Sequence, residues 1–169
     1  KAGMGIDTAS LGELTVALDP AMGVDPQKIG LHGNNKSVEC LRLALRSGIG
    51  RIIVDSLSEI DLLQSLSESE KTTAPVMVRV TTGVHAGGHS FIATAHEDQK
   101  FGLSLASGAA LQAVKKIIAA PNLRLVGLHS HIGSQIKDLE SFQVAVERLL
   151  AFRAQVQRLG EAVPEVDLG

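Results

Sequence analysis

Charged and imidazole side chains recur near the ends of short apolar runs in this chain of 169 residues. They are Asp7, His32, Asp55, Arg79, His129, His131 and Asp167. Such groups can bind an anion, orient a ligand ring or transfer a proton. Arg79 lies inside an apolar run, so its charge needs a carboxylate or a ligand anion nearby, and Asp7 and Asp55 are the candidates. Structural ion pairing alone would explain Arg79 equally well.

Two imidazoles on one strand face, His129 and His131, suggest a site, and they could share a metal ion as in a metal-dependent hydrolase. The sequence offers no clear third and fourth ligand for that interpretation. A segment rich in glycine and polar residues runs from 83 to 103 without a helical period, and a loop of this length in a compact domain is commonly functional. The histidines within it, at positions 85, 89 and 96, are expected to be solvated.

Short β-type runs alternate with helical patterns along the whole chain. The alternation predicts strands at 4–9, 28–32, 51–55, 76–82, 124–131 and 165–168, and helices at 11–22, 37–47, 58–69, 106–119 and 138–159. This order is typical of right-handed βαβ units that build a parallel sheet. Ser10 and Glu13 form a capping-box pattern, Gly48 and Gly50 mark a helix end, and Asp138 can cap the last helix.

Side-chain alternation within the strands gives each polar residue a predicted face. In the run 124–131, His129 and His131 lie opposite Val126 and Leu128. The other strands repeat this arrangement, with a polar residue near the carboxyl end. It favours a (β/α)8 barrel, whose inner strand faces point to the barrel axis and whose site lies at the carboxyl ends of the strands. An open doubly wound sheet also gathers polar residues there and stays an alternative.

Composition narrows the partners of the chain. A formal net charge of −2, a sequence pI near 6.3 and no cluster of basic residues argue against nucleic acid as a partner. A single cysteine, Cys40, cannot form an internal disulfide, and its apolar neighbours predict a buried helical thiol. No apolar run approaches the ~18 residues of a membrane span, so no membrane contact and a cytoplasmic location are expected.

Six segments together resemble the fold-type III pyridoxal-phosphate-dependent decarboxylases, and among them the diaminopimelate decarboxylases. They read G-I-D-T-A-S-L-G-E-L at 5–14, H-G-N-N-K-S at 32–37, V-D-S-L-S-E-I at 54–60, R-V at 79–80, H-E-D-Q-K-F-G-L-S at 96–104 and G-L-H-S-H-I-G-S-Q-I at 127–136. The most specific feature is H-x-H-I-G-S-Q, preceded in order by K-F-G and G-I-D-T-A-S. In addition, E-V-D-L-G at 165–169 resembles the strand leading into the family's glycine-rich phosphate loop.

The resemblance implies a partial (β/α)8 TIM barrel of the alanine racemase-like type, holding about strands two to seven. It implies pyridoxal 5'-phosphate as cofactor and, for the full-length parent, a homodimer that converts meso-diaminopimelate to L-lysine and carbon dioxide. In such enzymes the cofactor acts as an electron sink. Decarboxylases of the same fold that act on arginine, ornithine or carboxynorspermidine remain alternatives, as does a binding relative without activity.

Residue by residue, the resemblance implies that His131 stacks on the cofactor ring and that Ser134 points toward the cofactor phosphate. Asp7 and Arg79 would belong to the polar shell beneath the ring. Two further residues, Lys100 and Glu13, would lie near the mouth of the barrel and the dimer contact.

The family's Schiff-base lysine lies on the strand before Asp7, and the sequence starts only six residues before Asp7. Lys1 is therefore not expected to be that lysine, and no catalytic residue is assigned within the chain. The resemblance thus predicts a single incomplete cofactor-binding barrel domain. The N-terminal strand with the lysine and the C-terminal β-domain would be absent, and the fragment by itself would be inactive.

Overall fold

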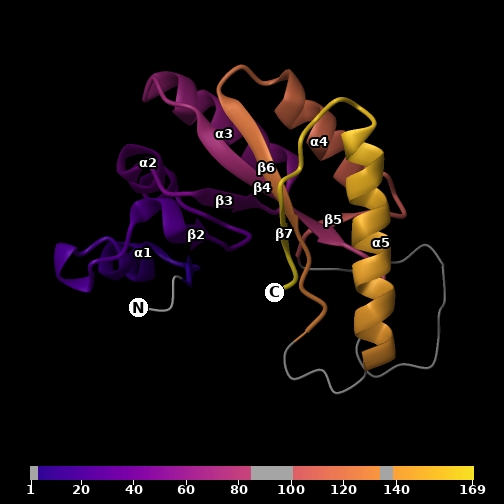
Figure 1. Ribbon diagram of the computed structural model, residues 1–169. Coiled ribbons are helices and arrows are strands. Elements are labelled where there is room, and N and C mark those ends of the chain that lie inside the picture. The colour runs from indigo at the N-terminus through magenta and orange to yellow at the C-terminus, as the bar shows by residue number, and fades with distance from the viewer. Residues whose placement is uncertain (1–3, 85–100, 134–138) are drawn as a thin grey trace.

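A computed structural model describes residues 4–84, 101–133 and 139–169, in which helices surround a parallel sheet (Figure 1). The strands are β1 (Ile6–Thr8), β2 (Ile29–Leu31), β3 (Arg51–Val54), β4 (Ala74–Thr81), β5 (Leu103–Ser104), β6 (Leu123–His129) and β7 (Glu165–Asp167). The helices are α1 (Leu11–Ala17), α2 (Val38–Ser47), α3 (Leu57–Ser69), α4 (Ala109–Ala119) and α5 (Leu139–Gln157), with two 3-10 turns, η1 (Pro20–Met22) and η2 (Pro26–Lys28). The strand order is β1-β2-β3-β4-β6-β7, and β5 pairs with β4 beside this path.

The sheet curls, as a barrel requires. Its strands follow the order of the chain, whereas a doubly wound sheet reverses direction at a switch point. In a flat sheet of this order β1 and β7 would lie about 24 Å apart, yet side-chain atoms of Asp7 and Asp167 come within 4.8 Å of each other. Arg51 of β3 also reaches Glu165 of β7 across two intervening strands. The predicted partial barrel is confirmed, and the open doubly wound sheet is excluded.

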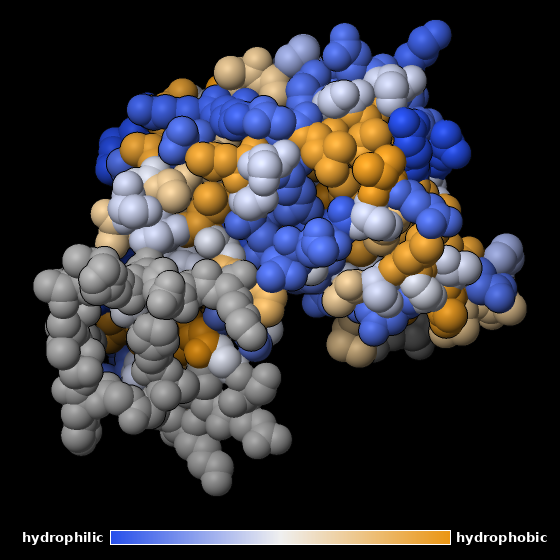
Figure 2. All heavy atoms as spheres, turned by 180° about the vertical axis from the view of Figure 1, so that it is seen from behind, coloured by the Kyte–Doolittle hydropathy of each residue, from blue (hydrophilic) through white to orange (hydrophobic). Residues whose placement is uncertain are grey.

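The outer face of the sheet packs against the helices through one aliphatic core. Val76 and Val80 of β4 are 0% and 2% exposed and share this core with Ile60 of α3 and Ile117 of α4. The surface over these layers is mixed: Figure 2 shows hydrophilic groups along the upper rim and in the centre of the rear face, with hydrophobic patches between them. The core fixes the outer face of each strand and so directs the alternate side chains inward.

A β-bulge in β6 corrects the expected side-chain alternation. The register with β4 slips after Val76, so that Met77 lies opposite Gly127 and one residue of β6 is left over. That residue is Val126, which joins Ile53 and Met77 in a small core separate from the outer one. The prediction that Val126 lies opposite His129 was wrong, because simple alternation takes no account of an inserted residue.

Several predicted boundaries were wrong for local reasons. The helix expected at 11–22 ends at Ala17, since Pro20 cannot continue it and begins η1 instead. The helix expected from 106 starts at Ala109, after Gly108 with a φ of 80°. The two-residue strand β5 was missed, because two residues carry no periodic pattern. The cap proposed at Asp138 lies outside the described residues.

The single cysteine behaves as expected. Cys40 is 3% exposed on α2, and burial raises the pKa of its thiol. A buried thiol with a raised pKa is a packing residue and a poor nucleophile. Among the described residues, no helix has the length and apolar character needed to cross a membrane.

Candidate functional site

The inward polar residues predicted from the sequence converge at the carboxyl ends of the strands. His32, just after β2, places Nε2 3.3 Å from Oδ1 of Asp7 on β1. Potential ligand atoms of Asp7, His32 and Asp167 all lie within 4.8 Å of one another, although they come from opposite edges of the sheet. This end of a barrel is where enzymes of the fold place their sites, and we call it the mouth.

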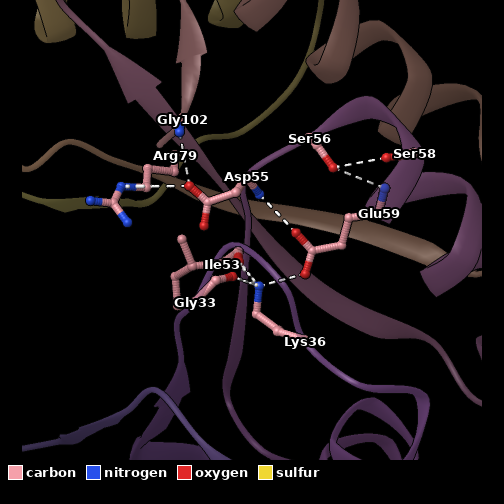
Figure 3. Close-up of polar contacts among 9 residues, drawn as sticks. All are labelled: Gly33, Lys36, Ile53, Asp55, Ser56, Ser58, Glu59, Arg79 and Gly102. Carbon is pink, nitrogen blue, oxygen red and sulfur yellow. Dashed lines mark hydrogen bonds and ion pairs between the residues drawn. The ribbon is translucent and has the colours of Figure 1, made fainter. Parts of the chain in front are cut away.

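Asp55 is the carboxylate that pairs with Arg79 (Figure 3). Its Oδ1 lies 3.7 Å from Nε of Arg79 and accepts a hydrogen bond from the Gly102 N–H at 2.9 Å. The Asp55 side chain is only 2% exposed, and its Oδ2 has no hydrogen-bond partner in the described part of the chain. Of the two partners considered for Arg79, the structure selects Asp55, and Asp7 pairs with His32 instead.

The guanidinium of Arg79 is held from two sides. Asp55 lies at its Nε, and the ring of Phe101 lies 4.8 Å from its central carbon. Figure 3 shows the two terminal nitrogens pointing away from Asp55, and no hydrogen bond joins them to another described residue. A guanidinium fixed in this way offers a pair of donors to a planar anion in the lumen.

His129 forms a neutral centre in the lumen. Its ring meets that of His32 edge to face at 4.9 Å, and the residue is 2% exposed. Burial lowers the pKa of His129 to about 4, with further lowering by His32, Arg79 and His131, although the Asp167 carboxylate opposes the shift. The imidazole is therefore uncharged near neutral pH, and its Nδ1 has no partner among the described residues.

His131 lies just beyond the end of β6 and is exposed. The chain end after β7 approaches it closely: a Cβ on Gly169 would lie 2.3 Å from Nδ1 of His131. Gly169 also has a φ of 83°, so both space and backbone favour glycine here. The structure thus brings the ring of His131 to the mouth, where a flat ligand could stack on it.

The other predicted site residues are placed as follows. Asp7 has a side chain 72% exposed at the open edge of the mouth. Glu13 is exposed at the start of α1, and its N–H donates to Ser10 Oγ, as the capping box predicted. Its Oε2 accepts a hydrogen bond from the Ala9 N–H at 2.6 Å, one residue before the Ser10 N–H that a capping box would use. The predictions for Ser134 and Lys100 lie outside the described residues.

A buried ion pair that was not predicted from the sequence lies next to Asp55. Lys36 Nζ lies 2.5 Å from Oε1 of Glu59, and the two side chains are 2% and 8% exposed. Oε2 of Glu59 accepts a hydrogen bond from the Asp55 N–H at 2.9 Å (Figure 3). A signal was present: the capping-box spacing of Ser10 and Glu13 recurs at Ser56 and Glu59.

The geometry gives no support to a metal centre built on His129 and His131. Within the described ranges, the potential ligands that cluster are Asp7, His32 and Asp167, and neither of these two histidines belongs to the group. Three ligand atoms spread over 4.8 Å leave a tetrahedral site incomplete.

The profile of a family described as "Pyridoxal-dependent decarboxylase, pyridoxal binding domain" matches residues 1–169. The chain belongs to this family. The diaminopimelate decarboxylases of Mycobacterium leprae and Bacillus subtilis are 49% and 42% identical to it, over 99% and 87% of the chain. The crystal structure of diaminopimelate decarboxylase from M. jannaschii superposes with a TM-score of 0.87 at 32% identity and covers 98% of the chain.

The chain spans 36% of the M. leprae relative, 33% of the B. subtilis relative and 38% of the M. jannaschii structure. Family membership confirms the resemblance to the fold-type III decarboxylases and the barrel of the alanine racemase-like type. It also confirms pyridoxal as the cofactor class of the family, and it excludes the metal-dependent hydrolase interpretation.

Proposed function

We propose that this chain forms most of the cofactor-binding barrel of a longer diaminopimelate decarboxylase, which converts meso-diaminopimelate to L-lysine and carbon dioxide. The observation that carries the proposal is the 42–49% identity to enzymes of that name over nearly all of the chain. A structure of the M. jannaschii enzyme in co-complex with L-lysine, at 32% identity, agrees with the proposed product. The rest of the protein would contribute the Schiff-base lysine and a C-terminal β-domain.

The residues at the mouth fit pyridoxal 5'-phosphate in chemistry. The exposed imidazole of His131 would stack on the pyridine ring, and Ser134 would bind the phosphate. Asp7 and Arg79 would belong to the polar shell beneath the ring, with the terminal nitrogens of Arg79 available to an anionic oxygen. When bound, the cofactor supplies an electron sink for the carbon that loses carbon dioxide.

The buried groups of the lumen would orient the ligand and exclude water. His129, with its pKa near 4, offers hydrogen bonds without adding charge beneath the ring. Asp55 holds Arg79 through Nε and so keeps its terminal nitrogens turned inward. The apolar side chains of Ile53 and Met77, each 1% exposed, keep water from the interior of the barrel.

We also infer that the protein forms a homodimer, with Lys100 and Glu13 near the contact. Glu13 supports this inference because it is exposed at the mouth, on the side where α1 begins. Reversing the charge in Lys100→Glu should shift the sedimentation coefficient toward that of a monomer. A Lys115→Glu variant, changed on the exposed face of α4, is the matched control and should sediment as the unaltered protein does. Equal sedimentation of both variants would contradict the contact.

Activity of the purified full-length protein tests the proposed reaction. With pyridoxal 5'-phosphate and meso-diaminopimelate, we expect release of carbon dioxide and an equal amount of L-lysine. Arginine, ornithine and carboxynorspermidine should be inert under the same conditions. Turnover of one of these amino acids, with meso-diaminopimelate left unchanged, would overturn the proposal in favour of another decarboxylase of the fold.

A further inference from the structure

Lys36 and Glu59 form the most buried ion pair in the described part of the chain, and the proposed function leaves it without a role. Their side chains are 2% and 8% exposed, compared with 35% and 67% for the pair Lys116 and Asp61. Removing an ion from water costs several kcal/mol, and apolar replacement of a buried pair is often neutral or stabilising. Stability is therefore a weak explanation for this pair.

The ammonium group of Lys36 has no donor to spare. Its Nζ donates to Gly33 O at 2.6 Å, to Ile53 O at 2.5 Å and to Glu59 Oε1 at 2.5 Å. A lysine side chain carries three donors and, when charged, no acceptor. Lys36 is thus a fixed cation that ties together the ends of β2 and β3 and the start of α3, and it is no candidate for the amine that binds a carbonyl cofactor.

Glu59 connects Lys36 to Asp55 in the candidate site. While Oε1 holds Lys36, Oε2 accepts the Asp55 N–H at 2.9 Å. The Asp55 carboxylate in turn accepts the Gly102 N–H at 2.9 Å and lies 3.7 Å from Arg79. Figure 3 shows these contacts as one continuous path from α3 to the guanidinium in the lumen.

We propose that Lys36 and Glu59 are positioning residues of the cofactor site. Their ion pair fixes the backbone at Asp55, and the short side chain of Asp55 then sets the place of the Gly102 amide and the direction of the Arg79 guanidinium. The step from Arg79 to the cofactor rests on the proposed function. The step from Glu59 to Gly102 does not, because it concerns contacts within the chain alone.

Amide hydrogen exchange at Gly102 in the full-length protein tests the part that is independent of the cofactor. The double variant Lys36→Met/Glu59→Leu leaves no unpaired charge, so we expect it to lose less stability than a variant that removes only one of the two charges. Asp55 N–H nevertheless loses its acceptor, and Gly102 should exchange about tenfold faster. The matched control Lys116→Met/Asp61→Leu, which removes an exposed pair between α4 and α3, should leave Gly102 unchanged.

A second double variant distinguishes a specific effect on the position of Asp55 from a general loosening of the structure. Lys36→Met/Glu59→Gln keeps an oxygen that can accept the Asp55 N–H, so protection of Gly102 should return to within about twofold of the unaltered protein. Equal protection of Gly102 in the leucine and unaltered proteins would overturn the proposal, whatever the activity of the enzyme. Equally fast exchange in the leucine and glutamine variants would overturn the path through Glu59.

Titration with pyridoxal 5'-phosphate, followed by the absorbance and fluorescence of the bound cofactor, tests the step to Arg79. We expect about fivefold weaker binding in the leucine variant and little change in the glutamine variant, because Arg79 keeps its charge but loses its alignment toward the anion. Fast exchange at Gly102 with unchanged affinity would overturn the role toward Arg79. Failure of the unaltered protein to bind the cofactor would instead count against the proposed function, and the exchange result would still decide the contact path.

Discussion

The two ends of the barrel differ in how far their polar groups are paired with one another. At the amino ends of the strands, which we call the floor, Arg51 makes two bonds to Glu165 and donates to Gln27 O at 3.1 Å. At the mouth, Oδ2 of Asp55 and Nδ1 of His129 are buried with no partner in the described segments. An unpaired buried polar atom costs about 1–3 kcal/mol. The floor therefore serves stability, and the mouth retains groups suited to a ligand.

The floor and the mouth also differ in the atoms that surround their glycines. A Cβ on Gly50, just before β3, would lie 2.0 Å from Gln27 O, and one on Gly127 would lie 2.7 Å from Glu165 O. Both of these neighbours are backbone atoms, which cannot move aside as a side chain can, although the side-chain Cε of Met77 would also lie 2.7 Å from a Cβ on Gly127. At the mouth, the nearest neighbour of a Cβ on Gly102 would be the side-chain Oγ1 of Thr81 at 2.8 Å. Of these three positions, Gly50 therefore leaves the least space for a methyl group.

We expect the largest effect on stability from adding a methyl group at the floor. Gly50→Ala should lower the free energy of unfolding by about 3 kcal/mol, because its methyl group meets a backbone oxygen. The control Gly12→Ala, in α1 with no atom within 4 Å of the new carbon, should raise it by about 0.5–1 kcal/mol. Urea unfolding measures both. If the two variants unfold alike, β3 and the η2 turn are not packed as described.

The next effect is a dependence of stability on pH that arises from His129 at the mouth. The pKa of His129 in the folded protein, about 4, lies below its ordinary 6.5, so the unfolded chain binds the proton more readily. Stability is therefore fully present above pH 6.5 and falls as the pH drops toward 4, by up to about 3 kcal/mol. Asp167, His32, Arg79 and His131 surround this group and shape the titration.

The variant His129→Gln removes this titration while leaving the neighbouring charges in place. The free energy of unfolding of both proteins is measured at pH 7.5 and at pH 4.5. The difference between the two proteins should be smaller at pH 4.5, by a large part of the roughly 3 kcal/mol expected for His129. A difference that stays constant between the two pH values would mean that folding leaves the pKa of His129 unchanged, and that the mouth is wetter than its burial indicates.

A smaller effect is expected for His131, because it is exposed. His131→Ala should weaken pyridoxal 5'-phosphate binding about tenfold, the scale of a lost aromatic contact, with an unchanged unfolding midpoint. His131→Phe keeps an aromatic face and should retain most of the affinity. Cofactor titration and thermal unfolding give the two readings. Equal affinity of the alanine and unaltered proteins would remove the stacking role and leave the mouth without its proposed ring contact.

The sequence predicted which residues of the mouth point inward, because alternation and helix periodicity are local patterns. Asp7, Arg79 and His129 were placed correctly on the inner face, and the order of strands and helices led to the barrel. Alternation failed at Val126, where the bulge inserts a residue. It also could not distinguish Asp7 from Asp55 as the partner of Arg79, since that depends on the curl of the whole sheet.

Long-range pairs were beyond prediction for a related reason. Arg51 and Glu165 lie 114 positions apart, and Lys36 and Glu59 lie 23 apart. Each residue alone has the pattern of an ordinary surface charge. Only the three-dimensional arrangement shows that one pair spans the floor and that the other is buried beside the mouth.

The smallest expected effect tests whether the pair Arg51 and Glu165, which we call the floor pair, helps to hold the sheet in its curled form. Arg51 and Glu165 are 31% and 38% exposed, so solvent screens their attraction, yet the guanidinium contacts both carboxylate oxygens. A double-mutant cycle with Arg51→Met and Glu165→Gln should give a coupling of about 1 kcal/mol, at the upper end for exposed pairs. The same cycle at Lys116 and Asp61, which share a single contact, should give about 0.3 kcal/mol.

The floor pair differs from that control in where its two residues lie. It joins β3 to β7, which are separated in the sheet by β4 and β6, whereas the control pair joins two neighbouring helices. Loss of the floor pair should therefore also loosen β7. Amide exchange at Asp167, whose backbone faces β6, should rise in Arg51→Met but stay unchanged in Lys116→Met. A coupling near zero with unchanged exchange at Asp167 would mean that the ladder between β6 and β7 holds the curl without help from the floor.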